Sequence, residues 1–214
     1  MIWNTQFLST IIIEQELMPN LYNVSVTFDC EVDDFCLQNI GFERIKYFFN
    51  SLLRDTVIAS KHNKATKSMM KSFNINWMLL PSEPNDQMVL WCLYHKLSSV
   101  LEKNFEILDM SIDSRQGDNI SYHYDGESLE MDIDPWLVNN KKIKPWWERP
   151  DQALYDATFS PTKDKVEIYY GQSSWEDIGL GWVTEKDLKK SNPKGKVVKP
   201  KKFQLKVVDG KNAT

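Results

Sequence analysis

Three histidines, at positions 62, 95 and 123, are the side chains of this chain that commonly exchange a proton near neutral pH. His123 is the best candidate for a general base, because it lies in the alternating stretch Ser121–Asp125 and points away from Tyr122 and Tyr124. A nucleophile would be needed beside it, but no Ser, Cys or Thr lies in a nucleophile-elbow motif. A catalytic triad would have to be assembled by tertiary contacts, so we expect the histidines to be structural or to face solvent.

Asp132 and Asp134 are the best candidates for metal ligands, because alternate residues of an extended strand project from the same face. Hard cations need several converging oxygens, and neither an EF-hand spacing nor a set of histidines and carboxylates accompanies this pair. We therefore predict no metal site. A metal-assisted hydrolase that uses His123 and Asp132 is kept as one alternative function.

Cofactor chemistry has no signature in this chain, since neither a P-loop nor a GxGxxG motif occurs among its eight glycines. The cysteines, Cys30, Cys36 and Cys92, form no CxxC pair and are expected to be buried free thiols in a reducing compartment. Glu14 and Glu16 interrupt the apolar stretch near the N-terminus, which argues against a signal peptide or a membrane span. We predict a cytoplasmic protein with no cofactor and no catalytic residue.

Two strands are predicted at the start of the chain. Residues 22–31 alternate between apolar side chains on one face and polar side chains on the other. The β-branched stretch 7–13 is expected to pair with them as a hairpin that turns around Met18-Pro19-Asn20.

Two amphipathic helices are also predicted. The first is expected to begin at Asp33 or Asp34 and to end near Asp55, since its apolar residues are spaced three or four apart. The second is expected to be capped by Asp86 and to bury one stripe that includes a lysine. That stripe consists of Val89, Cys92, Leu93, Lys96, Leu97, Val100 and Leu101.

Further strands complete the predicted domain. Residues 73–80 are expected to form a buried strand, and residues 105–113 and 119–124 a hairpin around Gln116-Gly117-Asp118. The order of these elements implies an α+β domain over residues 1–125, in which two helices pack on a mixed or antiparallel sheet.

Residues 126–150 are predicted to be an aromatic-rich linker, followed by a small β-rich region over residues 151–188. The linker carries Trp136, Trp146 and Trp147. These tryptophans are expected either to fix the linker to its own domain or to bind a protein or nucleic-acid partner.

The small β region resembles SH3-like barrels at both of its ends. Trp175 followed by Gly179-Leu180-Gly181-Trp182-Val183 resembles the closing part of a bacterial SH3-like barrel, whereas Ala153-Leu154-Tyr155-Asp156 resembles the start of a eukaryotic SH3 domain. The resemblance implies binding of a peptide or protein in an aromatic groove. That groove would contain Tyr155, Tyr169, Tyr170, Trp175 and Trp182.

A broader resemblance covers much of residues 22–150. Residues 38–48 (QNIGFERIKYF), Gly117-Asp118-Asn119-Ile120-Ser121-Tyr122 and the Trp146-Trp147 pair resemble uncharacterised proteins of T4-type tailed phages, particularly those that infect marine cyanobacteria. The resemblance implies a viral setting and lends no catalytic residue.

Charge divides the chain into two parts. Residues 189–214, the basic arm, contain nine lysines and one acid, a net charge of +8, whereas the whole chain has −4, which leaves −12 for residues 1–188. Such a separation favours binding of another macromolecule. The arm is expected to act either as a polybasic tether or as an added strand, because residues 202–208 alternate between polar and apolar side chains.

We therefore predict a non-enzymatic interaction or assembly protein of a phage, anchored through the basic arm to a protein partner or to a second copy. The alternatives are a nucleic-acid-associated factor, which would use the lysine-rich loop 61–71 and the arm, and the hydrolase described above. The predicted partner-binding residues are Trp136, Trp146, Trp147, Trp175, Trp182, Lys196, Lys199, Lys201, Lys202, Phe203 and Lys206.

Overall fold

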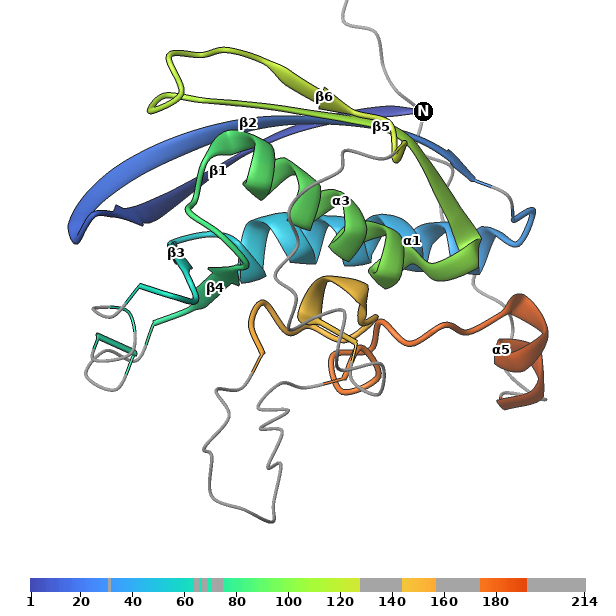
Figure 1. Cartoon of the computed structure of the whole chain (residues 1–214). Coiled ribbons are helices and arrows are strands. Elements are labelled where there is room, and N and C mark those ends of the chain that lie inside the picture. The colour runs from blue at the N-terminus through green and yellow to red at the C-terminus, as the bar shows by residue number, and fades with distance from the viewer. Residues whose placement is uncertain are drawn as a thin grey trace, which may run out of the picture.

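A six-stranded sheet with the order β4-β3-β1-β2-β5-β6 arches over two helices, α1 and α3, in the computed structural model (Figure 1). The structure describes residues 1–30, 32–63, 66, 69–70, 75–127, 144–156 and 174–191. The predicted α+β body, with two helices on a mixed sheet, is confirmed. Its elements are β1 (Ile2–Ile13), β2 (Glu16–Cys30), α1 (Phe35–Tyr47), the π-helix η1 (Phe48–Leu52), β3 (Thr56–Ser60), β4 (Trp77–Leu80), α3 (Asp86–Leu101), η2 (Glu102–Asn104), β5 (Phe105–Ser114), β6 (Tyr122–Tyr124), η3 (Trp146–Glu148) and α5 (Glu185–Ser191).

The first hairpin forms as predicted, but its turn lies elsewhere. Glu14 and Gln15 make the turn with positive φ angles of 49° and 80°, a conformation usually taken by Asn-Gly pairs. The predicted turn around Met18-Pro19-Asn20 is wrong, because Pro19 lies inside β2 opposite Thr10. Proline is tolerated there because β2 pairs with β5 only from Tyr22 onward, which leaves Pro19 on a strand edge.

The parallel strand β3 was missed by the sequence analysis. All five of its residues are buried, and it runs parallel to β1 and to β4. A parallel strand covered on both faces shows no alternation, so it lacks the period-two signal of the antiparallel strands. The next strand, β4, is shorter than predicted and begins at Trp77.

Both helices begin at an identifiable cap. Asp34 accepts a hydrogen bond from the backbone N–H of Cys36 at 3.0 Å, as predicted for α1. For α3 the prediction is corrected by one residue, because Asn85 is the N-cap and accepts from the N–H of Met88 at 2.8 Å. Asp86 instead accepts hydrogen bonds from the Ser114 hydroxyl, at 2.8 Å to each carboxylate oxygen.

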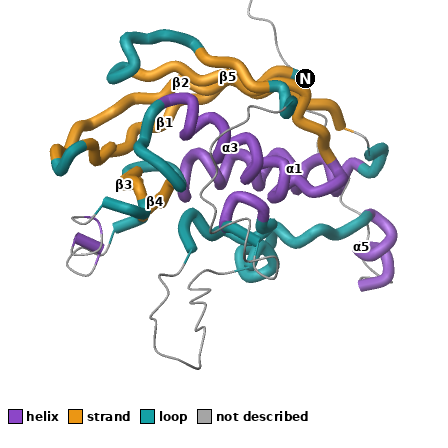
Figure 2. The backbone as a smooth tube through the Cα atoms, viewed as in Figure 1, coloured by secondary structure: helices purple, strands orange, loops and turns teal. Residues whose placement is uncertain are grey.

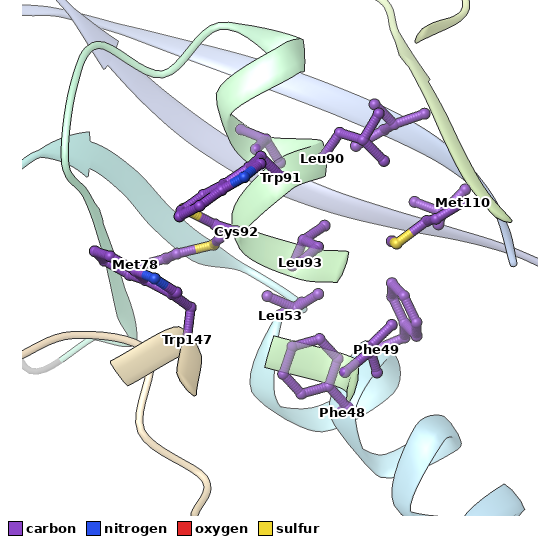
Figure 3. Packing of buried hydrophobic residues seen from close by; sticks show 14 of the residues in the cluster. Phe48, Phe49, Leu53, Met78, Leu90, Trp91, Cys92, Leu93, Met110 and Trp147 are labelled. Atoms are coloured by element: carbon purple, nitrogen blue, oxygen red, sulfur yellow. The ribbon is translucent and has the colours of Figure 1, made fainter. Parts of the chain in front are cut away.

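Segments from the predicted linker and small β region lie on the far side of the helices from the sheet (Figure 2). Trp146, Trp147 and Leu154 belong to the same hydrophobic core as the sheet and helices. Figure 3 shows Trp147 beside Trp91 of α3, and their ring centroids are 5.6 Å apart. The helices are therefore covered on both sides by described parts of the chain. A separate domain over residues 151–188 stays a prediction, since residues 157–173 lie outside the described residues.

Candidate protein-interaction surface

The face of the sheet opposite the helices, called here the outer face, is covered at one end only. Over β3 and β4 it carries a buried apolar cluster that Met69, Met70 and Tyr155 help to cover. Over β1, β2, β5 and β6 it is uncovered by the described residues, and most of its side chains are polar. Strand pairing alone decides which side chains meet on this open half.

One row of hydrogen-bonding side chains crosses the open half of the outer face. Asn4, Ser25, Ser111 and His123 are direct partners on the four neighbouring strands. A groove of about 600 Å³ lies along this row. Its lining consists of Asn4, Thr5, Gln6, Asn23, Val24, Ser25, Ser111 and Asp113. Amides and hydroxyls of this kind both donate and accept hydrogen bonds, as the backbone of an extended peptide requires.

The open half of the outer face belongs to strands that carry negative charge only. The four strands contain five carboxylates and neither lysine nor arginine. Two of the carboxylates border the row described above: Asp113 accepts a hydrogen bond from the Asn23 amide, and Asp109 lies 3.8 Å from His123 Nδ1. The surface is therefore suited to a cationic ligand. The five carboxylates are Glu16, Asp29, Glu106, Asp109 and Asp113.

Ser121, His123 and Asp109 lie in the order of a catalytic triad, but their geometry is loose. Ser121 Oγ is 3.5 Å from His123 Nε2, and His123 Nδ1 is 3.8 Å from the Asp109 carboxylate. The side chains of His123 and Asp109 are 65% and 40% exposed, so water competes for every contact between them. This arrangement does not favour the hydrolase alternative, whose second residue, Asp132, lies outside the described residues.

Tryptophans predicted to bind a partner are instead packed inside the chain. Trp146 and Trp147 are 0% and 2% exposed, and the Trp146 indole N–H donates to the Leu79 carbonyl at 2.8 Å. These contacts match the alternative in which the cluster fixes its segment to its own domain. Trp136 lies outside the described residues.

Trp175 and Trp182 both contact the guanidinium group of a buried arginine, Arg44. The Arg44 guanidinium carbon is 5.0 Å from the Trp175 ring centroid and 4.1 Å from that of Trp182. Arg44 also donates to the carbonyls of Val100 and Leu180, at 2.9 and 2.8 Å. Burial lowers the pKa of Arg44, with nearby acids acting in the opposite direction. Trp175 is buried, whereas Trp182 remains partly exposed. Their contacts with Arg44 join the segment before α5 to α1, and binding of a partner by these two tryptophans stays a prediction.

Lys96 is the most perturbed basic group in the described part of the chain. Its ammonium group is fully buried and donates to the carbonyls of Trp146 and Arg149, at 3.0 and 2.8 Å, and to Asp151 at 3.2 Å. Burial lowers the pKa of Lys96 to about 8, against the attraction of Asp151. Because all three donors are engaged and water has no access, this lysine is structural and not a nucleophile.

A second buried polar group lies on the inner face, near the start of α3, and the sequence analysis did not identify it. Ser9 Oγ, Asn20 Nδ2 and Tyr22 OH are buried without a hydrogen-bond partner among the described residues. Burial raises the pKa of the neighbouring Asp86 carboxyl, although the Ser114 hydroxyl opposes the shift. Only the alternation of residues 22–31, which places Tyr22 on the apolar face, hinted at this burial.

Asp34, Cys36 and Glu185 bring three ligand-type atoms within 4.8 Å of one another. The Asp34 carboxylate is already engaged, because it caps α1 and also accepts from the backbone N–H of Glu185 at 3.1 Å. Helix capping explains this cluster without a metal.

The arm residues predicted to bind a partner, Lys196, Lys199, Lys201, Lys202, Phe203 and Lys206, lie outside the described residues, as do Lys64, Lys67 and Lys71 of the basic loop. Among the described residues, no helix combines the length and the apolar character needed to cross a membrane.

Comparisons with known proteins give structural similarity at a distant level only. No protein-family model and no curated protein matches the chain. Among solved structures, a catalytic-residue mutant of Plasmodium vivax 6-pyruvoyltetrahydropterin synthase matches with 10% identity and a TM-score of 0.37. The match covers 58% of this chain and 97% of that one. A similarity of this size carries no inference about activity.

Proposed function

We propose that this chain is a non-enzymatic interaction protein, a component of an assembly, which binds an extended basic polypeptide segment on the open half of its outer face. The observation that carries the proposal is the charge of the strands that form that surface: they contain five carboxylates and neither lysine nor arginine, and Asp109 and Asp113 project from the outer face. The groove along Asn4, Ser25 and Ser111 supplies partners for a peptide backbone, and Asp109 and Asp113 attract its cations.

The same charge argues against nucleic acid at this surface, because carboxylates repel phosphates. The resemblance of the sequence to T4-type phage proteins supports a viral setting for the proposed role, within the cytoplasm of the host or in the virion. A gel shift at low and high salt tests the nucleic-acid alternative, which is favoured if DNA or RNA is retained at low salt.

Fluorescence anisotropy with the full-length protein tests the proposal directly. The probe is a labelled peptide of alternating lysine and valine, and the comparison peptide alternates glutamate and valine. We expect only the basic peptide to bind, and the double variant Asp109→Asn, Asp113→Asn to weaken binding about tenfold, which corresponds to about 1.4 kcal/mol.

The matched control is Glu83→Gln, Glu148→Gln, which removes the same charge from exposed positions outside these strands. It should leave binding unchanged. Equal binding of both peptides, or equal losses in the two double variants, would refute a specific site on the outer face.

A further inference from the structure

The outer face of β5 and the basic arm carry matching patterns. Asp109, Ser111 and Asp113 project from one face of β5 in the order acidic, polar, acidic. In the arm, Lys202, Gln204 and Lys206 have the order basic, polar, basic with the same spacing of two residues. Both patterns are symmetric, so an extended arm can match β5 in either direction.

The edge of the sheet next to β5 offers a place for such a segment. Within the described residues β6 is the last strand of the sheet and pairs only with β5. An exposed strand edge presents backbone groups to which another strand can add. A strand added beside β6 would lie two strand spacings, about 9.6 Å, from β5, which a lysine side chain can bridge toward a carboxylate.

The two faces of the sheet beside β6 differ in character, as do the two faces of an extended arm: one is polar and the other is apolar. His123 lies on the outer face with the acids, whereas Tyr124 is buried on the inner face against Tyr94 and His95, with ring centroids 4.8 and 5.8 Å away. A strand with lysines on the acidic side would therefore place its other residues beside this aromatic cluster. Those residues are Phe203, Leu205 and Val207.

We propose that residues 202–208 of one copy add as a strand to the free edge of β6 in a second copy. This rests on the proposed function in one respect, that Asp109 and Asp113 of the outer face attract the lysines; the added strand itself lies at the sheet edge and not in the groove. The described chain ends at α5, on the helix side of the sheet (Figure 1). Asp109 and Asp113 lie on the opposite, outer face. That separation favours the face of a second copy over the chain's own. Because arm and edge are different surfaces, the contact is head-to-tail and builds a ring or an open chain of copies.

Size-exclusion chromatography with mass determination tests this inference on the full-length protein. We expect an oligomer whose mass falls to that of a monomer in Lys202→Glu, Lys206→Glu, and equally in Asp109→Lys, Asp113→Lys. Mixing these two variants should restore association, because each supplies the partner that the other lacks. As a control, Lys194→Glu, Lys211→Glu makes the same charge change outside the added segment and should stay oligomeric.

Backbone pairing is tested by Gln204→Pro, which leaves the charge unchanged but removes an N–H and should also give a monomer. Circular dichroism confirms that each variant is folded. A monomeric wild type, or an oligomer that survives the Lys202 and Lys206 changes or Gln204→Pro, overturns the inference. If the wild type is monomeric yet still binds the lysine-valine peptide, the proposed function stands and the contact between the arm and the β6 edge of a second copy is wrong.

Discussion

Lys96 and Asp151 form an ion pair that joins the middle of α3 to the segment after η3, with Nζ and Oδ1 3.2 Å apart. The lysine is fully buried, whereas the Asp151 side chain is 29% exposed. Two backbone carbonyls complete the shell of the ammonium group. This contact holds Trp146 and Trp147 against the helix layer, so it links the predicted linker to the core.

Lys96→Met should destabilise the protein, because it removes the ammonium group that donates to the carbonyls of Trp146 and Arg149 and forms an ion pair with Asp151. We expect a loss of about 3 kcal/mol in the free energy of unfolding, measured with urea. Lys103→Met, an exposed lysine just beyond the same helix, is the control and should have little effect. An unchanged midpoint for Lys96→Met would show that the network adds nothing to stability.

The buried lysine also predicts how stability depends on pH. Its pKa is about 8 in the folded protein and 10.5 in an ordinary environment. Between these values the unfolded chain binds more protons at this site, so the contribution of Lys96 to the free energy of unfolding rises with pH. Below about pH 8 that contribution is constant.

Urea unfolding of the wild type and of Lys96→Met, at pH 7.5 and at pH 10, isolates this contribution, because the tyrosines titrate in both proteins. The free energy of unfolding of the wild type minus that of Lys96→Met should increase by up to about 3 kcal/mol from pH 7.5 to pH 10. A difference that stays constant with pH would mean that the lysine is not desolvated as described.

The contacts of Arg44 predict that its substitution will loosen the segment around α5. Arg44→Lys keeps the charge but loses the planar group that contacts Trp175 and Trp182 and one of the two carbonyl contacts. We expect faster amide hydrogen exchange in residues 174–191 and a loss of about 2 kcal/mol in stability. Arg54→Lys, at a side chain that is 73% exposed, should change neither measurement.

The architecture could be predicted wherever the periodicity was strong. Alternation identified most of β2, and the spacing of apolar residues identified α3, including Lys96 as a member of its buried stripe. The Glu14-Gln15 turn was missed because neither residue is a typical turn former, and β3 because its burial on both faces leaves no alternation. These misses concern short segments in which tertiary contacts override local preference.

The candidate surface could not be predicted from the sequence for a different reason. Asn4, Ser25, Ser111 and His123 lie far apart in the sequence and become neighbours only through the strand order β1-β2-β5-β6. No local sequence pattern predicts such a row. The excess of acids was evident from the composition, but the placement of Asp109 and Asp113 beside this row was not.

The hydroxyls of Ser9 and Ser114 are both buried on the inner face but differ in their hydrogen bonding. Ser9 Oγ has no partner among the described residues, whereas Ser114 Oγ donates to Asp86 and accepts from the N–H of Gly117 at 3.0 Å. Because an unpartnered buried hydroxyl is costly, Ser9→Ala should be neutral or stabilise by up to about 1 kcal/mol. Ser114→Ala should cost about 2 kcal/mol, since it leaves a buried carboxylate without its donor. Thermal and urea unfolding of the two variants measure the contrast, and a larger loss for Ser9→Ala would show that its hydroxyl is hydrogen-bonded after all.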